Sequence, residues 1–299
     1  MNTPEHVDLG PVRIYFGEKT GKYPDGNQVV VRGSDTLAIF DTPLVANRIG
    51  ADVDDAELVI LGHVHEDHMA GLHRVPKAAV HVHEADLDAA RSWDGLRRHY
   101  GYPSDALDDL KIKLDQEFHY FPRPDAIGYT DEATWDLGHC TVRALHMPGH
   151  TAGHSVLLVE PYGIAFIGDI DLSSFGPYYG DACSNLADFR STLARVADVP
   201  ARAWITSHHK GLITDRAQFI SLLTAFTAKI EAREARLEEL LREQPRTIKE
   251  LADCRVVYPP QAQELWVDAV ERRCISEHLN ELLAQDRVRL DDDQRYRLT

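Results

Sequence analysis

Cysteine is scarce in this sequence, and the four residues present, Cys140, Cys183, Cys254 and Cys274, lie far apart. No two of them form a C-x-x-C pair, so the sequence predicts neither a cysteine zinc site nor a dithiol redox motif. Free thiols in a reducing compartment fit this pattern. No apolar run approaches the roughly 18 residues of a membrane span, and residues 1–6 are polar rather than signal-like. We therefore expect a cytoplasmic protein with no membrane partner.

Basic residues are also in short supply. The chain has 32 Lys+Arg against 48 Asp+Glu, which gives a formal net charge of −16. Residues 1–215 carry −14 of this charge and residues 216–299 carry −2. No stretch is rich in lysine or arginine, and an acidic surface repels phosphate backbones at long range. We expect nucleic acid to be an unfavourable partner, whereas the sequence leaves a homodimer open.

The first two thirds of the chain alternates between strand and helix patterns. Residues 28–32 and 36–41 predict a hairpin, and residues 57–62 predict a short buried strand that ends in glycine. Residues 84–113 have a helical pattern, and a second strand-rich stretch covers 134–206. This order favours an α/β sandwich of two sheets with outer helices.

The last third changes to helical periodicity. Apolar residues recur at helical spacing over 219–241, which predicts a long amphipathic helix. Thr247 and Glu250 form a capping box that opens a short helix, and a third helix is predicted over 265–284. The alternating residues 287–298 predict a terminal hairpin. Three helices followed by a hairpin outline a winged helix. We therefore expect two domains, residues 1–215 and a small α+β domain at residues 216–299.

Histidine is the residue in excess. Five of the sixteen histidines fall within residues 63–68 and 150–154. The segment His63-Val64-His65-Glu66-Asp67-His68 directly follows a predicted strand. Because side chains alternate along extended backbone, His63 and His65 point the same way and can bind one metal ion, while Asp67 and His68 face a second. A loop that is rich in histidine by chance is the alternative, but this density of ligand types is improbable by chance.

Three further strand ends carry side chains of the same kind. His150 lies in a Pro-Gly turn that exposes it. Asp169 follows a buried strand, where an ionised carboxylate needs a cation or several hydrogen bonds, so we expect it to bridge two metal ions. Strand alternation favours His208 as a ligand and its neighbour His209 as a residue on the solvent or substrate side. His154, like Thr151, is expected to orient ligands, although a purely structural role for His154 is equally open.

Together these four motifs resemble those of the metallo-β-lactamase superfamily, over residues from about 12 to 213, and the H-x-H-x-D-H segment is the most specific of them. The resemblance implies an αβ/βα sandwich with the site at one edge of the two sheets, so residues 1–215 would be the catalytic domain. The C-terminal part resembles the winged-helix domain of a branch with endoribonuclease-like and thioesterase-like members. The resemblance assigns His63, His65 and His150 to a first metal, Asp67, His68 and His208 to a second, and Asp169 as the bridge.

These ligands predict a metal-dependent hydrolase. Two cations a few Å apart lower the pKa of a bridging water, and the resulting hydroxide attacks a carbonyl carbon or a phosphorus. Asp67 is expected both to bind metal and to orient this nucleophile. Zn²⁺ is the expected metal, while Fe and Mn also suit His and Asp ligands. A diiron redox protein is disfavoured because such relatives usually carry an acidic residue at the place of His65, and a structural metal site because it needs only four ligands.

The net charge of residues 1–215 and the segment after Asp169 indicate the class of substrate. The −14 charge of residues 1–215 favours a small ester, thioester or lactone over the alternative, a metal-dependent endoribonuclease or phosphodiesterase. In the segment after the bridging aspartate, Phe175, Tyr178 and Tyr179 are expected to contact an acyl group together with His209, and a tyrosine hydroxyl could support the oxyanion. Simple packing is the alternative for these aromatic residues.

Three other features bear on larger substrates. Lys210 or Arg190 would meet the phosphates of a coenzyme A thioester. Residues 93–102 could supply a lid. The terminal hairpin carries arginines, but Asp291-Asp292-Asp293 at its tip opposes a phosphate backbone. We therefore interpret the hairpin as a packing or dimerisation element rather than as an RNA-binding one.

Overall fold

The computed structural model describes residues 3–299; residues 1 and 2, which begin the polar N-terminal segment, lie outside it. The first of two large sheets pairs antiparallel as far as β4 and parallel from β4 to β7. In spatial order its strands are β1 (His6–Leu9), β2 (Val12–Tyr15), β3 (Gln28–Arg32), β4 (Leu37–Phe40), β5 (Leu58–Ile60), β6 (Ala79–His83) and β7 (Ile127–Tyr129).

The second sheet is antiparallel except for the parallel pair of β11 and β12. In spatial order its strands are β13 (Leu212–Ile213), β12 (Ala203–Ile205), β11 (Ile164–Phe166), β10 (Ser155–Glu160), β9 (Thr141–His146) and β8 (Thr134–Asp136). The predicted hairpin of β3 and β4 is confirmed.

The two sheets bury alternate side chains against each other. In β3, Val29 and Val31 belong to the core between the sheets, whereas Val30 belongs to the core under the helices. Phe40 of β4 and Phe166 of β11 meet across the interface with ring centroids 5.9 Å apart. This period-two burial is the physical reason that the short apolar runs fold as strands. The expected α/β sandwich is confirmed.

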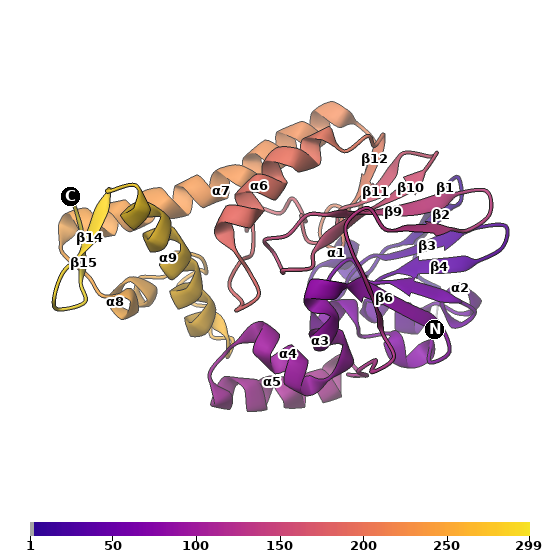
Figure 1. The fold of residues 1–299 in the computed structure, drawn as a ribbon, viewed down its shortest axis with the longest axis horizontal. Coiled ribbons are helices and arrows are strands. Elements are labelled where there is room, and N and C mark those ends of the chain that lie inside the picture. Colours follow the sequence, from indigo (N-terminus) through magenta and orange to yellow (C-terminus); the bar gives the residue numbers. More distant parts are fainter. Residues whose placement is uncertain (1–2) are drawn as a thin grey trace.

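Helices cover the outer faces of the sandwich. The indole of Trp204 in β12 stacks on Phe219 of α7 with centroids 4.3 Å apart, so α7 covers the second sheet (Figure 1). Among residues 3–299, no helix has both the length and the apolar character that crossing a bilayer requires. The helices before α7 are α1 (Glu18–Gly21), α2 (Ala51–Asp54), α3 (Leu87–Arg91), α4 (Trp93–Tyr100), α5 (Ser104–Glu117) and α6 (Leu186–Arg195), with 3-10 turns η1 (Leu44–Arg48), η2 (Glu66–His68), η3 (Leu72–Arg74), η4 (Glu84–Asp86) and η5 (Val196–Asp198).

The C-terminal segment continues from α7 into a small separate core. Its elements are α7 (Arg216–Glu243), α8 (Ile248–Asp253), α9 (Val267–Ala284), β14 (Val288–Leu290) and β15 (Tyr296–Leu298). The capping box at Thr247 and Glu250 is confirmed. Apolar residues of the first half of α7 join the main core, whereas those of its second half pack with α8, α9 and the hairpin. The helix therefore belongs to both cores, and the boundary at residue 215 stays a prediction.

Strand directions bring the functional motifs to one edge of the sandwich. β9 and β11 both pair antiparallel with β10, and β12 runs parallel to β11, so the carboxyl ends of β9, β11 and β12 point the same way. The amide of Ser155, at the start of β10, donates to the carbonyl oxygen of Gly62 just after β5 at 2.8 Å. This bond joins the corresponding edges of the two sheets.

Candidate metal centre

The segment after β5 directs two imidazole rings at one point. The chain is extended at His65 (φ −137°, ψ 166°) before it turns into η2. The Nε2 atom of His63 lies 3.2 Å from the Nε2 atom of His150, and the Nδ1 atom of His65 lies 3.1 Å from the same atom. All three rings are buried. The structure therefore brings together the three side chains assigned to the first metal.

These three nitrogens face one another. The Nδ1 atom of His150 donates to the carbonyl oxygen of Tyr178 at 3.0 Å, which leaves its Nε2 atom facing the other two rings. The Nε2 atom of His65 lies 2.9 Å from Asp181 Oδ2, so its Nδ1 atom is left to face the other rings. Ligand atoms about 2.0–2.1 Å from a tetrahedral zinc ion lie about 3.3 Å apart, so the spacing suits one divalent ion.

Asp67, His68 and His208 form a second group. The Nε2 atom of His208 lies 3.1 Å from Asp67 Oδ2, and that of His68 lies 3.7 Å from Asp67 Oδ1. Although buried and 3.2 Å from Asp169 Oδ1, the Nε2 atom of His68 forms no hydrogen bond of acceptable geometry in the part of the chain that the structure describes. A buried nitrogen without a partner costs free energy, and a metal ion would satisfy it. The group therefore fits a second divalent cation.

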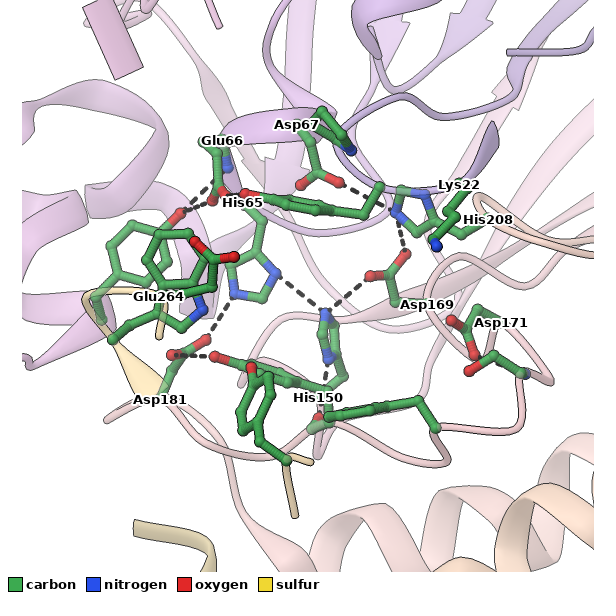
Figure 2. A pocket seen from close by; sticks show the side chains of 18 of the residues that line it. Lys22, His65, Glu66, Asp67, His150, Asp169, Asp171, Asp181, His208 and Glu264 are labelled. Atoms are coloured by element: carbon green, nitrogen blue, oxygen red, sulfur yellow. Dashed lines mark hydrogen bonds and ion pairs between the residues drawn. The ribbon is translucent and has the colours of Figure 1, made fainter. Parts of the chain in front are cut away.

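Asp169 lies between the two groups. Its Oδ1 atom is 3.2 Å from His68 Nε2 and 3.5 Å from His208 Nε2, while its Oδ2 atom is 3.4 Å from His150 Nε2. Figure 2 shows this carboxylate between His150 on one side and His208 on the other. Burial raises the pKa of Asp169, but the charges of the neighbouring histidines outweigh burial and hold it well below its ordinary value. An ionised carboxylate with one oxygen toward each group has the geometry of a bridging ligand.

His154 positions this bridging carboxylate through the backbone. Its Nδ1 atom donates to the carbonyl oxygen of Met147 at 3.0 Å, and its Nε2 atom accepts the amide of Asp169 at 3.2 Å. Burial lowers the pKa of His154 to about 3, so the ring stays neutral and can accept. Gly168 has a φ of 54°, and a Cβ atom there would lie 2.6 Å from the His154 ring. Only glycine therefore fits between the ring and the turn.

The remote ring nitrogens of the second group are also held. The Nδ1 atom of His68 lies 2.7 Å from Asp41 Oδ2. The Nδ1 atom of His208 donates to the carbonyl oxygens of Gly21 and Asp25 at 2.8 and 2.9 Å. Such contacts fix the tautomer and the ring plane of a metal-binding histidine.

The two adjacent histidines after β12 separate cleanly. His208 is buried and faces the second group, whereas the side chain of His209 is 33% exposed and its Nε2 atom lies 3.6 Å from Asp171 Oδ2. His209 adopts a left-handed conformation with a φ of 62°, which turns the chain away after His208. The side chain of His208 therefore faces the second group, whereas that of His209 faces the cavity.

A cavity of about 700 Å³ opens onto the metal centre. Of the residues expected to meet substrate, Phe175, Tyr178 and His209 line it. Tyr179 does not: its side chain is fully buried, and its hydroxyl group lies 2.8 Å from His278 Nε2 of α9. The expectation for Tyr179 is therefore wrong, because the loop turns this ring into the contact with the C-terminal segment. From the segment expected to supply a lid, Tyr100 and Tyr102 line the cavity.

Three acidic residues of the centre were missed by the sequence analysis. Asp181 holds His65, and Asp41 holds His68. Asp86 accepts the amides of Val64 and Gly153 and the hydroxyl group of Thr151, so it ties the two histidine-bearing loops together. Only Asp41 had a signal in the sequence, because it ends a predicted strand as Asp169 does. Asp86 and Asp181 lie in segments with no motif.

Two known proteins are similar to this chain in sequence. The acyl-coenzyme A thioesterase MBLAC2 of Bos taurus is 26% identical over 236 residues, which cover 67% of this chain and 77% of that protein. The metallo-beta-lactamase fold-containing protein ST1585 of Sulfurisphaera tokodaii is 28% identical over 170 residues, which cover 53% of this chain and 60% of that protein.

Solved structures share the fold. A beta-lactamase domain protein from Burkholderia ambifaria superposes with a TM-score of 0.70 at 17% identity, covering 99% of this chain and 95% of that one. The metallo-beta-lactamase family protein TTHA1429 from Thermus thermophilus gives a TM-score of 0.66 at 24% identity, covering 92% and 94%. The sequence profile of the metallo-beta-lactamase superfamily matches residues 24–229, which is more than half of the chain. The protein therefore belongs to the metallo-beta-lactamase superfamily and is a hydrolase of that family.

Proposed function

We propose that the protein hydrolyses a small ester, thioester or lactone at a centre of two divalent metal ions. The observation that carries the proposal is the pair of ligand groups joined by Asp169, with a cavity opening directly onto them. The relative MBLAC2 is an acyl-coenzyme A thioesterase by its name, which supports a carbonyl substrate.

The proposed ligands divide by geometry. We assign His63, His65 and His150 to one ion and Asp67, His68 and His208 to the other. We assign Asp169 to both, because its two oxygens face the two groups. Imidazole and carboxylate ligands suit Zn²⁺, with Fe and Mn as alternatives. Two such ions supply a water of lowered pKa and stabilise the negative charge that develops on a carbonyl oxygen.

Residues of the chain then position the reactants. Asp67 uses Oδ2 toward His208, and we propose that its Oδ1 atom accepts a hydrogen bond from the attacking water. His154 fixes the backbone of Asp169 and so the spacing of the two ligand groups. The hydrogen bond of His65 to Asp181 outweighs the effect of burial and raises the pKa of His65 to about 8, which makes its ring a stronger ligand.

The cations near the cavity differ from those expected for coenzyme A. Arg190 pairs with Glu231, Glu234 and Glu281, and neither it nor Lys210 lines the cavity. The lysines that do line it are Lys22 and Lys113. We therefore propose that Lys22 and Lys113, rather than Lys210 or Arg190, contact the phosphates of a coenzyme A thioester.

The arginines of the C-terminal hairpin argue against RNA as the substrate. Arg287 pairs with Glu234 and Glu238, Arg295 pairs with Glu250, and Arg297 pairs with Asp291. Phosphate binding would have to break these pairs, so the segment offers little affinity for a nucleic acid. We propose that residues 216–299 are a winged-helix-like segment that packs against the catalytic part.

A direct competition of substrates tests the reaction. Zinc-reconstituted protein would be assayed against acyl thioesters, aryl esters, lactones and single-stranded RNA at several salt concentrations. We expect turnover of at least one carbonyl substrate and none of RNA. Metal-dependent RNA cleavage that falls steeply with salt, without turnover of any carbonyl compound, would instead establish the ribonuclease alternative.

Replacement of the two adjacent histidines tests the ligand assignment. We expect His208→Ala to lose one metal equivalent, because its Nε2 atom faces Asp67 and Asp169. His209→Ala should keep both equivalents, which makes it the matched control. Elemental analysis after reconstitution and gel filtration measures both. Loss of metal from the His209 variant alone would reassign the ligand.

A further inference from the structure

Part of the wall of the substrate cavity comes from the C-terminal segment. Beyond the proposed metal ligands, both charged residues and aromatic or apolar residues from several parts of the chain line the cavity. Phe175 comes from the loop after Asp169, Leu110 comes from α5, and Tyr258 and Trp266 come from the segment between α8 and α9. Figure 1 shows the start of α9 close to α4 and α5, so the C-terminal segment reaches the catalytic part at this point.

Tyr258 is held in place by a buried carboxylate. Glu271 of α9 is fully buried and accepts the backbone amides of Val256, Val257 and Tyr258 at 3.0, 3.0 and 2.7 Å. The ring of Tyr258 packs on Phe175 with centroids 5.3 Å apart. The three amide donors offset the free-energy cost of burying the Glu271 carboxylate. Because the loop must lie in this position to form these bonds, they hold Tyr258 in place.

Trp266 lines the cavity and contacts α5. The Nζ atom of Lys113 lies 4.7 Å from the centroid of the Trp266 ring and 5.8 Å from that of Tyr23. A lysine over an indole ring gains a cation–π contact, while its methylene stem covers apolar surface. Trp266 and α5 therefore both border the cavity that also contains the proposed metal ligands.

The same C-terminal helices support the loop that carries the site. A Cβ atom on Gly180 would lie 2.3 Å from Val270 of α9, so the loop packs directly on this helix. Arg273 of α9 donates to the carbonyl oxygens of Asp181 and Ala182 at 3.2 and 2.8 Å. The C-terminal segment thus shapes the cavity in two ways: it lines the cavity, and it fixes the loop that contains Gly180 and Asp181.

We propose that Tyr258 and Trp266 form an acyl-binding wall, through which the C-terminal segment selects substrates with an unbranched apolar acyl chain of several carbons. This inference rests on the ester or thioester hydrolysis proposed above. Each methylene group that the wall removes from water raises affinity about fourfold. The affinity of the protein should therefore increase with acyl length, and the increase should depend on these two side chains.

Binding of carboxylates isolates this wall from the metals. Titration calorimetry would compare butyrate with decanoate on zinc-reconstituted wild type, Tyr258→Ala and Trp266→Ala. Butyrate and decanoate offer the same carboxylate to the metals. The ratio of their affinities therefore measures the contribution of the longer alkyl chain alone. We expect this ratio to fall by about tenfold or more in each alanine variant. Leu265→Ala is the matched control, because Leu265 precedes Trp266 but is 50% exposed and does not line the cavity.

Kinetics then separate the two proposals. For decanoyl thioesters, Trp266→Ala should raise KM by about tenfold, whereas the control Leu265→Ala should leave the KM for decanoyl thioesters as in wild type. Trp266→Phe keeps an aromatic ring and should retain most of the ratio of decanoate to butyrate affinity. This variant tests the proposal even if Trp266→Ala does not fold. Equal affinity ratios in all variants would overturn the acyl wall. The expected ratios without hydrolysis of any ester, thioester or lactone would overturn the proposed reaction and leave the wall standing.

Discussion

Asp67→Asn is expected to lower turnover by at least about 100-fold, the scale of losing one positioned catalytic group, while the protein keeps most of its metal. Asparagine keeps an oxygen ligand of the same shape but removes the negative charge. Burial raises the pKa of Asp67, but the neighbouring His68 and His208 outweigh burial and hold it below its ordinary value, so the group is ionised. An amide oxygen accepts a proton poorly, so the attacking water would lose its orientation and its base.

The measurement is kcat on the best carbonyl substrate together with metal content by elemental analysis. Asp55→Asn, a change at an exposed carboxylate away from the centre, is the matched control and should behave as wild type. If the asparagine variant binds two metals and turns over normally, Asp67 acts only as a ligand.

Removal of the metals is expected to abolish hydrolysis and to lower the melting temperature on the order of 5–10 °C. Ions that bind only the folded chain stabilise it, by about 2.7 kcal/mol when they are present at 100 times their Kd. The metal-free centre also keeps Asp41, Asp67 and Asp169 buried close together, where His68 and His208 pair with these carboxylates.

Chelation followed by differential scanning calorimetry and an activity assay checks this expectation. Zn²⁺ should restore both the melting temperature and the hydrolytic activity. Mg²⁺ should restore neither, because it prefers oxygen ligands and keeps its bound waters. Chelation should lower the melting temperature of His63→Ala by less than that of wild type, because this variant already lacks one ligand of the first metal group. An unchanged melting temperature with unchanged turnover would contradict a metal-dependent reaction.

The ligand-bearing motifs were readable because each is local. His63 and His65 are two residues apart in an extended segment, so alternation alone predicts that they point the same way. Pro148 and Gly149 mark the turn at His150, and a short buried strand precedes Asp169 as well as His208. The long helix α7 and the capping box of α8 were equally local.

The partners of these residues were not readable in the same way. Asp181 lies 116 positions from His65, and Asp86 lies 65 positions from the Thr151 that it binds. Neither aspartate stands in a motif. Tyr178 and Tyr179 are adjacent, yet one lines the cavity and the other packs on α9, because their loop lies between the site and a helix much further along the chain.

Local patterns in the sequence predicted most of the strands, the long helices and the four motifs that carry the proposed ligands, because backbone periodicity and turn chemistry act over a few residues. The grouping of these motifs around Asp169, the side chains that orient each ring, and the part of the cavity wall that α9 and its preceding loop supply follow from the tertiary structure. Such contacts depend on how sheets and helices pack at long range. Side-chain pattern along the chain carries little information about that packing, because many arrangements bury the same apolar faces.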